Sequence, residues 1–147
     1  MGKTSELTTI YSVNGRNRQL QLAAFIADNN IRPWQPGNVD CCMVLADWAV
    51  WLGHPDPAAH LHGAYDSDEG FRQIIAAHGG VVPLITSCIP TSGKRIQHPS
   101  AGDIGVIGSP TNIKRQFGAI HDGSGWLVRM YSSFGRMTAQ TLAAWTI

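Results

Sequence analysis

The chain contains few charged residues. Lys, Arg, Asp and Glu make up 14% of its 147 residues, and the formal net charge is +1. Typical soluble domains contain about 25% of these residues. No run of basic residues is longer than two, whereas a nucleic-acid-binding protein needs a concentrated basic face. We therefore expect no nucleic-acid partner, and the low charge favours an assembly subunit whose surface is covered by neighbours.

Long apolar runs and a cysteine framework are also missing. No stretch of about 18 apolar residues is present, so we expect no membrane span. Residues 1–10 lack the apolar segment of a signal peptide, which predicts synthesis in a cytoplasm and export only within a larger particle. Three cysteines, two of them adjacent, do not form a disulfide framework. His54, His60 and His62 lack further ligands at a recognisable spacing, so we expect no metal and no cofactor.

The residue pattern predicts one α+β domain. Residues 1–14 are polar and β-branched, which predicts a loose segment or a short strand. We expect residues 1–15 to be an N-terminal arm that orders on assembly, and residues 16–147 to be a single domain. Apolar spacing predicts helices over residues 16–29, 42–52, 68–78, 81–88 and 138–145. Shorter apolar runs predict an antiparallel meander of strands over residues 104–107, 117–121 and 126–131.

The Asp40-Cys41-Cys42 motif lies at the head of the most apolar predicted helix. Asp40 is a typical N-cap residue, because its carboxylate accepts hydrogen bonds from the first N–H groups of a helix. A cysteine in a first helical turn lies where the helix dipole favours the thiolate, which is the nucleophilic form. Cys41 is therefore a candidate nucleophile, and such a nucleophile needs a histidine as its base.

Several short motifs occur in an order that carries a resemblance. They are Trp34, Asp40-Cys41, Ala46-Asp47-Trp48, His78-Gly79-Gly80, Gly102-Asp103 and Ala143-Ala144-Trp145. This order resembles the papain-like NlpC-type cell-wall cysteine peptidases. It is still more similar to a family of tailed-phage and prophage proteins that accompany tail-tip and baseplate genes. Over residues 33–147 the resemblance implies a papain-like fold, with N-terminal helices packed on a small antiparallel sheet, and a location in the virion.

The catalytic histidine of that peptidase pattern has no counterpart here. The pattern places it at the start of the second strand, where this chain has Gln116, and an amide cannot accept the thiol proton. The next strand, which supplies the third catalytic residue, carries Arg129, and a cation cannot orient an imidazolium. His121 follows Gln116 by five residues, so in a regular strand it points to the opposite face unless a bulge intervenes. His98 precedes Gly102-Asp103 by a flexible link and could swing in.

Three functions are compatible with this sequence. The first is a structural component of a bacteriophage tail tip or baseplate, with a degenerate peptidase-like fold and other tail proteins as partners. The alternative is an active endopeptidase or amidase in which Cys41, activated by His121 or His98, cleaves peptidoglycan during genome entry. The third is a module that binds peptides or glycans in the degenerate cleft. Under the structural interpretation Cys41 is a small buried hydrophobe, and we expect Cys42 and Cys88 to belong to the core in every case.

Overall fold

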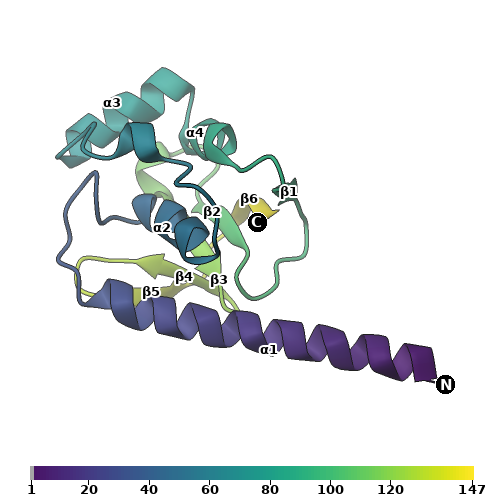
Figure 1. Cartoon of the computed structure of the whole chain (residues 1–147). Helices are drawn as coiled ribbons and strands as arrows, with labels where there is room; N and C mark the ends of the chain where they lie inside the picture. Colours follow the sequence, from purple (N-terminus) through teal and green to yellow (C-terminus); the bar gives the residue numbers. More distant parts are fainter. Residues whose placement is uncertain (1) are drawn as a thin grey trace.

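The computed structural model describes residues 2–147, and side chains from residue 16 onward. The described residues form four α-helices and an antiparallel sheet with the strand order β1-β6-β2-β3-β4-β5, which confirms the α+β class (Figure 1). No helix in the described part of the chain is both long and apolar enough to cross a membrane. The elements are α1 (Gly2–Asn30), α2 (Met43–Trp51), η1 (Ala59–Leu61), α3 (Asp68–His78), α4 (Val81–Cys88), β1 (Lys94–Arg95), β2 (Ile104–Gly108), η2 (Ile113–Arg115), β3 (Gln116–His121), β4 (Trp126–Arg129), β5 (Phe134–Met137) and β6 (Thr141–Thr146).

The central helix α2 is apolar nearly all round, and other elements surround it on several sides (Figure 1). Trp48 is fully buried, and its indole N–H donates a 2.8 Å hydrogen bond to the carbonyl of Gly102, just before β2. The ring of Phe25 from α1 packs 5.3 Å from that of Trp48. The sheet supplies Ile104 and Val106 to the same core. This packing fixes α2 relative to the strands.

The two faces of the sheet carry separate apolar clusters. Successive side chains of a strand alternate between faces, so Ile104 and Val106 join the α2 core while Ile107 joins a smaller cluster on the other face. The buried members of that smaller cluster are Ile107, Ala119, Trp126, Val128 and Ala144. Trp126 is therefore part of this smaller core.

The N-terminal segment is helical. Helix α1 runs from Gly2 to Asn30, so the predicted loose segment or short strand is wrong for residues 2–14, and Met1 lies outside the described residues. Residues 2–15 contain no proline, and the helix predicted for residues 16–29 continues upstream without a break. The N-terminal part of α1 extends past the rest of the molecule (Figure 1). Its ordering on assembly stays a prediction.

The C-terminal segment is a strand and not a helix. The predicted helix over residues 138–145 is wrong, because β6 lies inside the sheet between β1 and β2. Ala143 and Trp145 contact the α2 core, whereas Ala144 belongs to the opposite cluster. A strand that is buried on both faces has a continuous apolar run, and such a run lacks the alternation that identifies a half-exposed strand.

The turn between β3 and β4 provides a pH-dependent contact. Asp122 accepts hydrogen bonds from the N–H groups of Ser124 (2.8 Å) and Gly125 (2.9 Å), and it pairs with Arg136 of β5. Burial acts to raise the pKa of this carboxyl, but Arg136 and the two N–H groups outweigh it and lower the pKa to about 2. The ionised form is therefore favoured by folding.

Replacing Asp122 with alanine is expected to lower the free energy of unfolding at pH 7 by roughly 1 kcal/mol, after allowance for solvent screening. Because the folded-state pKa is depressed, the contribution of Asp122 is present above about pH 4 and is lost as the pH falls towards 2. Urea unfolding at both pH values measures this difference. Asp66→Ala, at an exposed position without a described hydrogen bond, is the matched control. An Asp122→Ala deficit that persists at pH 2 would contradict the assignment.

Candidate functional site

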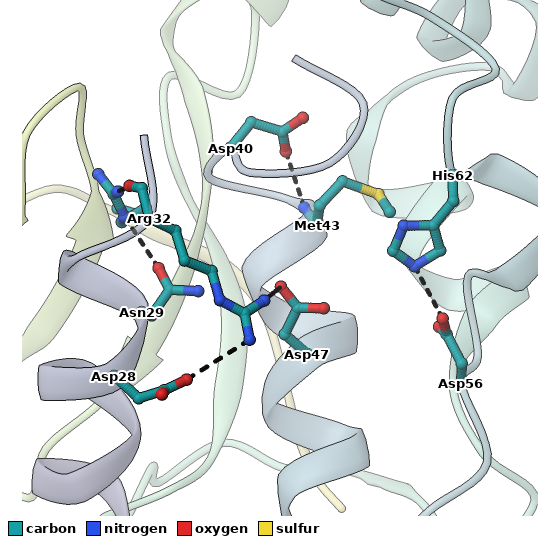
Figure 2. A network of polar contacts seen from close by, with 9 residues as sticks. Asp28, Asn29, Arg32, Asp40, Met43, Asp47, Asp56 and His62 are labelled. Carbon is teal, nitrogen blue, oxygen red and sulfur yellow. Dashed lines mark hydrogen bonds and ion pairs between the residues drawn. The ribbon is translucent and has the colours of Figure 1, made fainter. Parts of the chain in front are cut away.

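The Asp40-Cys41-Cys42 motif forms the entry to α2. The sequence predicted that Cys41 lies in the first turn of the helix. The helix begins at Met43, however, so Cys41 precedes α2. The carboxylate of Asp40 is buried, and its Oδ1 accepts a 2.9 Å hydrogen bond from the N–H of Cys42. The same oxygen accepts a 2.7 Å hydrogen bond from the N–H of Met43 (Figure 2). The N-cap position of α2 is Cys42, so Asp40 lies two residues before it and holds the turn that leads into the helix.

The other oxygen of Asp40 binds a residue that the sequence did not reveal. Asp40 Oδ2 accepts hydrogen bonds from the hydroxyl of Tyr65 (2.5 Å) and the N–H of Gly37 (2.9 Å). Burial and the Asp40 charge raise the pKa of Tyr65, so the phenol stays a neutral donor. Gly37 has φ +89°, and a Cβ there would lie 2.0 Å from the carbonyl oxygen of Tyr65. Asp40 thus accepts four hydrogen bonds and serves the structure, with no acceptor position left for a thiol.

A cavity of about 360 Å³ opens beside Cys41. Strands β3 and β4 pair only at Ile120↔Leu127 and His121↔Trp126, although both continue beyond these residues. The unpaired parts of the two strands, from Gln116 on one side and Val128 on the other, border the cavity. The cavity that Cys41 lines therefore lies where β3 and β4 diverge after two paired residues.

Gln116 lines this cavity together with Cys41. A Cβ on Gly118 would lie 2.4 Å from the carbonyl oxygen of Cys41, so β3 passes close to the motif and only glycine fits there. Ile120 belongs to the α2 core, and alternation puts Gln116 and Gly118 on that same face. The amide of Gln116 donates a 2.8 Å hydrogen bond to the carbonyl of Ser109, which holds the side chain in place. An amide, and not an imidazole, therefore borders the cavity at the expected histidine position.

His121 lies at the far end of β3. The register with β2 is continuous from Gln116 to His121, so no bulge turns His121 towards α2. His121 follows Gln116 by five residues of strand, which corresponds to roughly 17 Å between the two positions. The His121 ring packs against Trp126 with a centroid distance of 4.9 Å, and its Nδ1 accepts a hydrogen bond from the N–H of Gly123. Burial lowers the pKa of His121. The structure therefore does not bring this candidate base to Cys41.

His98 is exposed in the loop that follows the edge strand β1. Two strands, β6 and β2, separate β1 from β3, which corresponds to roughly 14 Å between β1 and β3. All six histidines lie in the part of the chain whose side chains are described, and none of them lines the cavity. Neither His98 nor His121 therefore lines the cavity beside Cys41.

Arg129 occupies the strand that supplies the third catalytic residue in the peptidase pattern. The side chain is 1% exposed and points to the end of α1, where it donates to the Asn29 side-chain oxygen (2.9 Å) and the Arg32 carbonyl (2.6 Å). Figure 2 shows Asn29 and Arg32 together at this helix end. Arg129 also donates to the carbonyl of Met130. Arg129 therefore links β4 to the segment at the end of α1, which is a structural role.

The remaining candidates lie away from the cavity. Cys42 and Cys88 pack against the α2 core and line a separate apolar cavity of about 50 Å³, as expected for core cysteines. A hydrogen bond with Cys41, together with burial, raises the pKa of Cys42. His62 pairs with Asp56 at 2.7 Å (Figure 2). No group of three or more His, Cys, Asp or Glu side chains that could hold a metal ion is found in the described part of the chain.

Comparison with known proteins identifies one family. A family model described as a domain of unknown function (DUF6950) matches residues 16–147, which is most of the chain. No curated protein and no solved structure matches it. The matched region covers both the Asp40-Cys41-Cys42 motif and β3, so every candidate site residue lies within it.

Proposed function

We propose that this chain, which belongs to the DUF6950 family, is a non-catalytic structural component of a bacteriophage tail tip or baseplate. It would have a papain-like, NlpC-type fold whose catalytic centre has lost its base. One observation carries the proposal: Cys41 and Gln116 line the same cavity, and none of the six histidines does. The tail assignment itself comes from the ordered motifs of the sequence and their resemblance to phage proteins.

The arrangement of elements supports the papain-like part of the proposal. In that fold the cysteine lies at the head of a central helix that packs on an antiparallel sheet, and here Cys41 precedes α2 and adjoins β3. The Gly102-Asp103 motif leads into β2, and β3 is its hydrogen-bonded neighbour. These are the relative positions that the resemblance implies.

The chemistry of the cavity argues against turnover. A cysteine peptidase needs a base that takes the thiol proton and returns it to the leaving amine. The Gln116 amide cannot titrate near neutral pH, and both oxygens of Asp40 are occupied by backbone N–H groups and Tyr65. Arg129 replaces the residue that would orient a base. In a papain-like fold this cavity would be at the position of the catalytic site, and the residues that line it would supply no proton acceptor.

The surface of the described residues supports a role in an assembly. Several large apolar side chains are exposed, including Ile31 (82%), Tyr131 (70%) and Leu20 (64%). Charged residues make up only 14% of the chain. Exposed apolar side chains on a chain with few charges are suited to contacts with neighbouring proteins.

Quantitative mass spectrometry of purified phage particles tests the proposal. We expect the chain in a fixed copy number relative to the major tail protein, and we expect Cys41→Ser particles to infect at the wild-type titre. Cys88→Ser, which alters a thiol outside the Cys41 cavity, is the matched control. The proposal fails if particles lack the protein, or if Cys41→Ser alone lowers the titre.

A further inference from the structure

The Cys41 cavity has features of a binding site that the structural role does not use. We propose that it is a docking site for a short acidic segment of a neighbouring tail protein. The segment places an apolar side chain between the aromatic walls of the cavity and a carboxylate against the cations Arg72 and Lys114. This inference rests on the proposed function, because it takes the cavity as a degenerate cleft that binds without cleaving.

The walls of the cavity are apolar and adaptable. Trp34 and Tyr131 pack against each other on one side, with ring centroids 4.8 Å apart. Tyr131 (70%), Ile113 (43%) and Met130 (39%) all line the cavity and are among the exposed large apolar side chains of the described residues. Exposed apolar side chains that gather around one cavity mark an interaction site, and a methionine can adjust to different partners.

The charges around the cavity favour an anionic partner. Arg72 and Lys114 line it and are exposed, and no described carboxylate forms an ion pair with either. Arg129 also lines it, but its guanidinium is buried and already donates to oxygen atoms of the protein. Two carboxylates, Asp40 and Asp68, also line it. Asp40 is already satisfied by four donors, and Asp68 lies in the first turn of α3, where the helix dipole stabilises it. The cations of the rim are therefore available to a carboxylate of the partner.

The size of the cavity restricts the partner to a short peptide segment. About 360 Å³ accommodates a few side chains and not a folded domain. A nucleic acid would need a longer row of cations than the exposed pair Arg72 and Lys114. An apolar side chain next to a carboxylate, on an extended peptide, matches both the walls and the rim.

A random octapeptide library displayed on an unrelated carrier, selected against the full chain, tests this inference. We expect enriched sequences that combine Asp or Glu with a neighbouring apolar residue. Reversal of both rim charges, Arg72→Glu with Lys114→Glu, should weaken the selected peptides by about tenfold or more. The matched control is Lys94→Glu with Arg95→Glu on the edge strand β1, where both residues are exposed and away from the cavity. Bound peptide should also slow alkylation of Cys41 by iodoacetamide, which locates the peptide in the cavity.

Several results would overturn the inference. They are the absence of enrichment, enrichment of basic sequences, equal binding by the rim variant, or displacement of the selected peptides by a murein fragment at comparable concentration. Circular dichroism of the rim variant verifies that it is folded, and Tyr131→Ala, at an exposed position, supplies a second variant expected to lose binding. Failure of the library with the protein still present in particles removes only the docking site. Hydrolysis of murein would instead remove the proposed function.

Discussion

Replacing Arg129 with methionine is expected to lower the free energy of unfolding by about 2–3 kcal/mol, because buried oxygen acceptors would lose a charged donor. The guanidinium is 1% exposed and joins β4 to the end of α1 through the Asn29 side chain and the Arg32 carbonyl. Methionine fills most of the volume but donates no hydrogen bond. The Asn29 side chain, which is also 1% exposed, would then keep a buried oxygen without a donor.

Urea unfolding at pH 7, followed by circular dichroism, measures this loss. Arg115→Met is the matched control, because Arg115 is exposed in η2 and its side chain forms no described hydrogen bond. We expect this control to change the free energy of unfolding by about 0.5 kcal/mol or less. Equal stability of the two variants would mean that the contact between Arg129 and α1 contributes nothing to the fold.

Replacing Asp40 with alanine is expected to cost about 3 kcal/mol, the second of the two largest effects. The change removes the acceptor of four hydrogen bonds, from the N–H groups of Gly37, Cys42 and Met43 and from the hydroxyl of Tyr65. Tyr65 is 6% exposed, so its hydroxyl would be left buried without an acceptor. Loss of these contacts also releases the loop that positions Cys41.

Thermal and urea unfolding of Asp40→Ala test this expectation. Asp68→Ala is the control, since Asp68 lies in the exposed first turn of α3 and is expected to contribute only about 0.5 kcal/mol. Tyr65→Phe, which removes one of the four donors, should give an intermediate loss of about 1 kcal/mol. Asp40→Ala with the stability of Asp68→Ala would show that Asp40 does not hold the loop.

Local signals in the sequence were sufficient to predict several elements. Ser67 caps α3 by accepting a hydrogen bond from Gly70, and Gly79 ends that helix with φ +86°, as the residue types predict. The helix over residues 81–88 and the strands β2, β3 and β4 were likewise predicted close to their observed positions. Their positions depend on residues that are near in sequence. The sequence predicted a helix in place of β6. Ala143 and Ala144 face opposite sides of the sheet and both are apolar, so the segment shows no alternation that would identify a strand.

The candidate site was only partly accessible from the sequence. Alternation along β3 was sufficient to predict that His121 and Gln116 face opposite sides, because strand geometry needs only local information. Tyr65 was missed, since it meets Asp40 across 25 residues and no spacing rule links them. The contact of Arg129 with Asn29 spans 100 residues and was missed for the same reason. The separation of β3 from β4, which forms the cavity, depends on the packing of the whole fold.

The most direct test of the central claim is the release of soluble fragments from labelled peptidoglycan sacculi by the purified protein. Because no histidine lines the Cys41 cavity, we expect the wild type and Cys41→Ser to release no more fragments than buffer alone. Release by the wild type that Cys41→Ser abolishes would contradict the account, because it would require a proton acceptor beside Cys41.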